Sequence, residues 1–338
     1  MLLSTRRSAN RASVLGLRRW GAVAVWLGVV TTATGQFLGA DSCSTSGCHG
    51  GAADQSRQRA IWDKFDPHSR AYATLTMGRS ARMIEALGGT DATRDRRCTD
   101  CHAPHPTQRL EGVSCENCHG AVEPWLRSHT RPDYSHADRL AAGMRDLRDP
   151  YARANACVAC HQCLPLDLLQ AGHPELLFEL DGQLTGMKKH WRSDLDRPAA
   201  QTWLVGQAVA LRELAGQPHE RNREQRDALV WLLTAAGEDA SQPDAVARRV
   251  AAESWTAERT RELLQRLTGT SADFARADVS RLQHAHRAER LVLALDRLLA
   301  GQKSAELDTL FALAQSRSDF DPGKFAGALA QFNTSVSR

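Results

Sequence analysis

A cysteine–cysteine–histidine unit recurs along the first half of the chain and restricts its possible folds more than any other sequence feature. Three copies have the form C-x-x-C-H, at Cys98–His102 ("CTDCH"), Cys115–His119 ("CENCH") and Cys157–His161 ("CVACH"). A fourth copy, Cys43–His49 ("CSTSGCH"), has a longer spacer between its cysteines. Nine cysteines in an exported chain would ordinarily indicate disulfides, but a disulfide framework does not require a histidine after each pair.

The unit has the spacing that covalent haem attachment needs. Haem carries two vinyl groups on one edge, and each can form a thioether with a cysteine. Two residues between the thiols place both sulfurs along that edge, and the histidine that follows can bind the iron. We therefore predict four covalent haem c groups. The expected thioether cysteines are Cys43, Cys48, Cys98, Cys101, Cys115, Cys118, Cys157 and Cys160, and the expected proximal iron ligands are His49, His102, His119 and His161.

Structural zinc is the main alternative for these residues. Zinc takes four nitrogen or sulfur ligands, typically from paired C-x-x-C knuckles, but it gives no reason for a histidine after every second cysteine. The longer spacer of Cys43–His49 can bulge outward without moving either sulfur. Cys163 is the odd cysteine, and we expect a free or buried thiol, with an axial-ligand or redox-sensitive role as the alternative.

The first 36 residues have the pattern of an export signal. Five arginines precede the apolar run Trp20–Val30, and small polar residues follow it. The run is shorter than the roughly 20 apolar residues that span a bilayer, so we predict a cleaved signal and a periplasmic or otherwise exported protein. An uncleaved anchor is the alternative, and only that form would associate with a membrane.

Charge and composition exclude several classes of protein. The chain has 43 basic and 39 acidic residues, and loss of the five leader arginines leaves 38 basic residues, so the mature net charge is near −1. This balance does not indicate nucleic-acid binding. The 42% hydrophobic and 24% charged content is ordinary for a soluble globular protein. Aromatic residues make up only 6%, and haem would supply the missing apolar surface.

Five phrases around the motifs carry a resemblance to a known family. They are "IWDKFDPHSRAY", "GVSCENCHG", "WLRSHT", "AGHPELLFEL" and "MKKHW", between about Asp41 and Trp191. In this order they resemble the multihaem cytochromes related to cytochrome c-554. The resemblance implies a mostly helical fold with closely packed haems, most of them bis-histidine ligated, and a role in electron transfer. In the type member one haem lacks a distal protein ligand.

The resemblance also implies distal iron ligands. His68, His129 and His173 match histidines associated with distal ligation, and His190 in "KKHW" is a further candidate. A surface or packing role is the alternative for each. Relatives often carry another histidine shortly before "AGHP", where this chain reads "CLPLDLLQ". One iron without a distal histidine, and therefore five-coordinate, is an alternative to four bis-histidine sites. No cysteine follows Cys163, which limits the predicted count to four haems.

The other histidines are expected to have different roles. His105 lies close to His102 and is expected to hydrogen-bond locally or to a haem propionate, whereas the role of His136 is left open. Three histidines on charged helical segments are expected to face solvent: His219, His284 and His286. Three arginines could form ion pairs with haem propionates: Arg70, Arg97 and Arg127. Exposure to solvent at the protein surface is the commoner role of such arginines.

Helix signals dominate from Pro198 onward. Apolar residues recur at helical spacing after Trp203, two segments end at Gly237 and Gly269, and Asp273–Ala300 carries an apolar stripe. Asp321–Pro322 has the pattern of a helix start. We predict four to six helices in a bundle that completes the core of the haem domain, with a docking surface for a redox partner as the alternative.

These observations predict a mainly α protein. A loop-rich multihaem cytochrome c domain (41–195) would follow the export signal (1–36) and precede the helical bundle (198–335). The expected function is electron transfer between redox partner proteins, such as an oxidoreductase donor and a quinol or cytochrome acceptor, with no catalytic residue. The alternatives are a multihaem enzyme acting on a small nitrogen, sulfur or oxygen species at a five-coordinate haem, and a haem-dependent sensor or structural subunit.

Overall fold

The computed structural model describes residues 35–105, 107–162, 164–192, 196–217, 219–302 and 304–336. Within these ranges every regular element is a helix and no strand occurs, which confirms the mainly α prediction. None of the described helices is both long and apolar enough to cross a membrane. Nearly all of the predicted export signal lies outside the described residues, as does Cys163.

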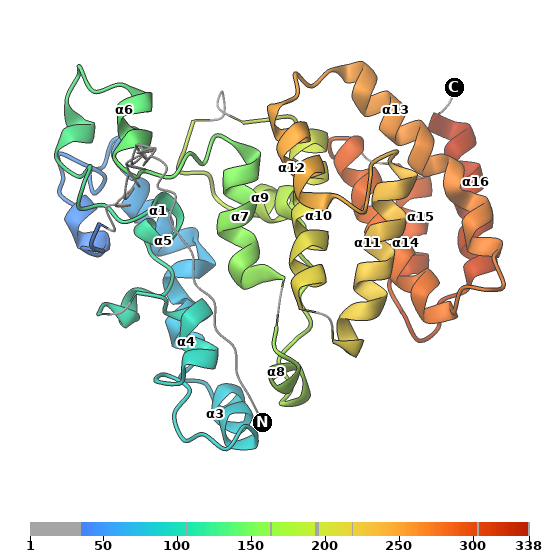
Figure 1. Cartoon of the computed structure of the whole chain (residues 1–338), viewed down its shortest axis with the longest axis horizontal. Helices are drawn as coiled ribbons and strands as arrows, with labels where there is room; N and C mark the ends of the chain where they lie inside the picture. Colours follow the sequence, from blue (N-terminus) through green and yellow to red (C-terminus); the bar gives the residue numbers. More distant parts are fainter. Residues whose placement is uncertain are drawn as a thin grey trace, which may run out of the picture. The chain divides into compact units, whose positions relative to one another are not determined.

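Short helices joined by loops carry the cysteine–histidine units, in the blue-to-green part of Figure 1. The α-helices of this region are α1 (Gln58–Phe65), α2 (Ala71–Thr74), α3 (Gly78–Ala86), α4 (Arg96–His102), α5 (Cys115–His119), α6 (His136–Ala141), α7 (Pro150–His161), α8 (Leu166–Gln170) and α9 (Leu180–Gly186). Short 3-10 turns lie at Ala40–Cys43, Pro67–Arg70, Arg109–Glu111 and Ser128–Thr130. Many of these elements are only one or two turns long, in agreement with the predicted loop-rich region.

Longer helices follow in the yellow-to-red part of Figure 1. They are α10 (Ala199–Gly216), α11 (Arg223–Ala235), α12 (Pro243–Ala252), α13 (Ala257–Thr268), α14 (Arg281–Leu298), α15 (Ala305–Ala314) and α16 (Pro322–Val336), with 3-10 turns at Glu220–Asn222 and Gly269–Ala275. Seven α-helices therefore lie in the described part of this region, and the prediction of four to six was too low. The helices α12 and α15 were missed, and both are short, with 10 residues each.

One predicted helix begins later than expected. The run from Asp273 was expected to be helical, but α14 starts only at Arg281. Ser280 caps it, because its backbone N–H donates to the Gln283 side chain while its hydroxyl accepts from the Gln283 backbone N–H. A predicted helix end is confirmed at Gly237, just after the C-terminus of α11. Gly237 has a φ of +84°, in the left-handed region that favours glycine after a helix.

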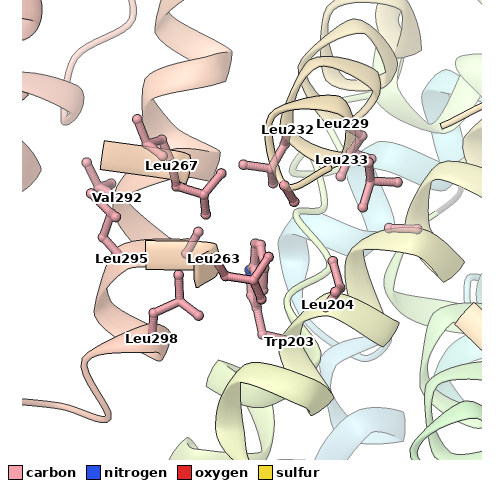
Figure 2. Packing of buried hydrophobic residues seen from close by; sticks show 14 of the residues in the cluster. Trp203, Leu204, Leu229, Leu232, Leu233, Leu263, Leu267, Val292, Leu295 and Leu298 are labelled. Carbon is pink, nitrogen blue, oxygen red and sulfur yellow. The ribbon is translucent and has the colours of Figure 1, made fainter. Parts of the chain in front are cut away.

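The helix α10 lies at the centre of the main hydrophobic core. Its Trp203 and Leu204 are fully buried. Figure 2 shows these two side chains converging with apolar residues of three other helices: Leu229, Leu232 and Leu233 of α11, Leu263 and Leu267 of α13, and Val292, Leu295 and Leu298 of α14. This packing explains why α10 is apolar on nearly all sides.

The motif-bearing region shares this core through α7. Ala154 and Val158 of α7 belong to the same buried cluster as α10. At the rim, the Tyr151 hydroxyl donates to Asp244 at 2.7 Å, and Arg212 donates to the Asn155 side-chain oxygen at 2.6 Å. The helix that carries the fourth motif therefore packs against the bundle.

Two histidines expected to face solvent are buried instead. His284 and His286 of α14 are only 2% and 5% exposed, because α14 packs against several helices of the bundle. The ring of His284 lies 5.7 Å from that of Phe274, and its Nε2 is 3.1 Å from the Arg276 carbonyl oxygen. His219 is half-buried, with its Nε2 3.1 Å from the Leu164 carbonyl oxygen. His284 and His286 are therefore packing residues of the bundle, whereas His219 contacts the segment that follows the fourth motif.

Candidate functional site

Each regular motif occupies the last turn or turns of a helix. Helices α4, α5 and α7 all end at the motif histidine. Because the cysteines are three residues apart and the histidine is four residues after the first, the three side chains share one helix face. The end of each of these helices therefore presents two thiols and an imidazole on one face, as haem attachment through thioethers requires.

The first unit reaches a similar arrangement without a regular helix. A 3-10 turn ends at Cys43, and the backbone N–H of His49 donates to the Cys43 carbonyl at 3.0 Å. Inside this loop the backbone N–H of Cys48 donates to the Thr45 carbonyl at 2.9 Å. The longer spacer therefore folds into a closed turn that keeps Cys43 next to His49.

Every motif histidine lies opposite a different one of the four histidines predicted to be distal ligands. The ring centroids are 6.3 Å apart for His49–His129, 5.8 Å for His161–His68, 6.4 Å for His102–His173 and 6.3 Å for His119–His190. A metal bonded to two imidazole nitrogens at about 2 Å each separates the ring centroids by about 6 Å. The four pairs have the spacing that one metal between two imidazoles needs.

Hydrogen bonds at Nδ1 leave Nε2 of several of these histidines free for a metal. The Nδ1 atoms of His129 and His173 face the carbonyl oxygens of Trp125 at 3.1 Å and Pro174 at 2.9 Å. The Nδ1 atom of His49 faces the Gln58 side-chain oxygen at 3.0 Å. Metal-bound histidines characteristically donate the other ring N–H in this way.

Two further histidines have partners contributed by the short helices around "DPHSRAY". The Nδ1 atom of His102 lies 2.9 Å from the Thr74 hydroxyl and 3.2 Å from the Ala71 carbonyl oxygen. The Nδ1 atom of His68 lies 2.8 Å from a carboxylate oxygen of Asp66. These orienting partners were missed in the sequence analysis, because backbone carbonyls and common polar side chains carry no motif of their own.

Burial favours the neutral forms of the site's side chains. Desolvation lowers the pKa of His119 to about 4, and it also lowers the pKa of His102, His161 and His190. Neutral imidazole is the form that binds a metal. Burial raises the pKa of the Cys115 and Cys157 thiols to about 12. A thioether carries no charge, so these buried positions suit haem-bonded sulfur.

Electrostatic interactions between cysteines link the four units into a series. Cys43 of the first unit interacts with Cys115 of the third, and Cys118 interacts with Cys157 of the fourth. Cys160 of the fourth interacts with Cys101 of the second and lowers the pKa of the Cys101 thiol. The spatial order of the units along the series is therefore first, third, fourth, second, which differs from their order in the sequence.

A buried glutamate fixes the segment that leads into the first unit. Glu116, inside the "CENCH" motif, is 1% exposed. Its carboxylate accepts backbone N–H groups from Leu38 at 3.0 Å, Gly39 at 2.6 Å and Val122 at 2.9 Å. This residue was also missed in the sequence analysis, because a spacer position in the motif carries no chemical requirement. It ties the first unit to the third.

His105, His136 and Arg97 contact polar groups close to the motifs. His105 is fully buried, and its Nδ1 accepts backbone N–H groups from Thr107 and Gln108, as the predicted local hydrogen bonding requires. The Nε2 atom of His136 lies 3.3 Å from a carboxylate oxygen of Asp146. Arg97 pairs with Asp95 at 2.7 Å. Among the described residues, no three His, Cys, Asp or Glu side chains gather around one point in the manner of an ion site.

The comparisons with known proteins agree with the resemblance. Residues 42–120 match the family model described as cytochrome c554 and c-prime, a stretch that contains the first three units. No curated protein matches the chain. No solved structure matches it either. The match over this stretch supports the predicted relationship to cytochrome c-554, and that relationship indicates covalently bound haem c and a role in electron transfer.

Proposed function

We propose that this protein is an exported tetrahaem c-type cytochrome that passes electrons between redox partner proteins through closely spaced, bis-histidine haems. The observation that carries the proposal is the pairing of the histidines. Four motif histidines and four non-motif histidines form four separate pairs, all at ring separations that suit one iron. The export signal and the periplasmic location belong to the same proposal and rest on the sequence pattern of the leader.

Haem c, when bound, supplies a one-electron couple whose potential depends on its ligands and surroundings. The chain's own residues hold it in two ways. The eight cysteines would provide thioethers, and the paired imidazoles would occupy both axial positions. A position taken by a second histidine leaves no vacancy for a small substrate, so this arrangement favours electron transfer over the alternative of an enzyme with a five-coordinate haem.

The series of units supports a route for the electrons. Neighbouring units interact directly through Cys43 and Cys115, through Cys118 and Cys157, and through Cys160 and Cys101. We infer that electrons pass between the first and second units by way of the third and fourth. Partner proteins would then exchange electrons at the two ends of the series, and Cys48 of the first unit is exposed in this structure.

Mass spectrometry of protein made in a host with cytochrome c maturation tests the haem count. The proposal predicts a mature chain without its leader and with the added mass of four haems. Cys43→Ala in the irregular unit should weaken attachment at that unit alone, because only one of its two thioethers would remain. A mature mass with three haems or fewer, or a colourless protein that takes up zinc, would overturn the proposal.

A further inference from the structure

One of the eight paired histidines has a charged partner. Within the described residues, the Nδ1 atoms of His49, His102, His129 and His173 face uncharged oxygens, as set out above. The Nδ1 atom of His161 lies 3.4 Å from the side-chain nitrogen of Gln183. The Nδ1 atom of His68 lies 2.8 Å from Asp66, and no other described carboxylate contacts a ring nitrogen of these eight residues.

The carboxylate of Asp66 is held in place and shielded from water. Asp66 is 5% exposed, and its Oδ1 atom also accepts the backbone N–H of His68 at 3.0 Å. Pro67 follows it at the first position of the 3-10 turn and fixes the backbone there. Among the described residues, neither Lys nor Arg forms an ion pair with Asp66, so its negative charge is not cancelled by a neighbouring cation.

A fixed carboxylate on a histidine ligand has a known direction of effect. It accepts the Nδ1 proton and makes the opposite nitrogen a stronger electron donor to the metal. Its charge also stabilises the additional positive charge of oxidised iron, and the effect is larger where water is excluded. Both effects lower the reduction potential of the bound group.

We propose that Asp66 lowers the reduction potential of the haem held by His161 and His68, and so distinguishes it from its neighbours. The inference rests on the proposed function. This haem belongs to the fourth unit, which lies inside the series between the third and the second. A low potential at an interior position makes it unfavourable for an electron to stay there. Electrons would therefore reside on either side of the fourth unit, and the series would divide into two parts.

Potentiometric titration of the purified holoprotein tests this assignment. Asp66→Asn keeps an oxygen acceptor for His68 but removes the charge, so one of the four midpoint potentials should shift in the positive direction. A smaller positive shift is expected at the His119–His190 site, because Asp66 also interacts electrostatically with His190. Asp66→Glu should retain a potential close to that of the wild type.

Two further variants complete the test: one adds a carboxylate beside a different paired histidine, and the other removes a carboxylate that contacts none of them. Gln58→Glu places a carboxylate opposite the Nδ1 atom of His49, so a different midpoint should shift in the negative direction. Asp63→Asn removes the same charge three residues before Asp66, but its side chain is exposed, and all four midpoints should stay unchanged.

The outcomes separate this inference from the proposed function. Four low-spin haems with unchanged midpoints in Asp66→Asn would overturn the role of Asp66 and leave the tetrahaem proposal standing. A wild-type protein without four haems would overturn both. Should Asp66→Asn lose a haem, Gln58→Glu decides the matter, because a negative shift there supports the carboxylate effect and an unchanged potential contradicts it.

Discussion

In the proposed haem sites, His129 illustrates how a single side chain would set the chemistry of the iron. Its Nδ1 atom faces the Trp125 carbonyl oxygen, so the ring is turned with Nε2 toward His49. The two rings are nearly parallel, with 12° between their planes. Without His129, the iron bound by His49 would have a vacant sixth position, which is the condition for ligand binding at that site.

We expect His129→Ala to convert one of four low-spin haems to a high-spin form that binds nitric oxide. Optical and EPR spectra of the oxidised protein measure this change. His136→Ala is the matched control, because His136 pairs with Asp146 and faces none of the motif histidines. An unchanged spin state in His129→Ala, or the same change in His136→Ala, would contradict the assignment.

At the residue scale the sequence predicted the reactive groups better than the groups that orient them. The C-x-x-C-H spacing predicts the thioether cysteines and the proximal imidazoles directly, because bond geometry dictates that pattern. Distal histidines such as His173 and His190 have no fixed spacing, so only the family resemblance could suggest them. Thr74 could not be predicted as a hydrogen-bond partner of His102, because that contact depends on how separate short helices meet. Asp66 lies only two residues before His68, but the spacing alone does not show that its carboxylate contacts the ring nitrogen.

The short helices depend on particular anchoring residues more than on their own helical propensity. Helix α5 has only five residues, too few to be stable alone in water. Its Glu116 carboxylate collects three backbone N–H groups from outside the helix, two of them from the segment that precedes Cys43. Loss of this carboxylate would leave those buried N–H groups without an acceptor.

We predict that Glu116→Ala lowers the free energy of unfolding by about 3 kcal/mol, since each unsatisfied buried group costs about 1 kcal/mol or more. It should also reduce haem attachment at the first unit, which mass spectrometry measures. Glu123→Ala is the control, because Glu123 accepts the Gln36 backbone N–H from an exposed position. Equal effects of the two variants would show that burial of Glu116 is unimportant.

At the element scale, local signals located the long helices and failed for the short ones. Runs of apolar residues indicated α10 and α11, whereas α12 and α15 were missed. The solvent-facing prediction for His284 and His286 failed because flanking arginines and glutamates suggested an exposed face. Arg290 on the same helix is itself only 2% exposed, so charged residues in this helix do not mark its surface.

The whole molecule depends on a core that the two halves of the chain share. Ala154 on α7 is fully buried in the cluster formed with α10, three residues before the first cysteine of the fourth unit. Folding of the bundle and placement of the fourth unit should therefore be coupled. The sequence predicted that the bundle would complete the core of the haem domain, but it did not identify α7 as the contact, because α7 has mixed polarity and its apolar face is defined only by its packing against α10.

We expect Ala154→Asp to lower the free energy of unfolding by at least about 3 kcal/mol, because it buries a charge in an apolar core. The same variant should reduce haem attachment at the fourth unit. Urea unfolding followed by circular dichroism, together with the protein mass, measures both effects. Ala152→Asp on the half-exposed part of α7 is the control and should change neither quantity. Full stability of Ala154→Asp would contradict a shared core.

The EPR spectrum of the oxidised wild-type holoprotein, recorded before and after addition of nitric oxide, tests the central claim most directly. Paired histidines at all four units predict that every ferric haem is low-spin and that nitric oxide changes none of them. A high-spin signal equivalent to one haem, or one nitrosyl complex per protein, would contradict the account and favour a multihaem enzyme with an open iron.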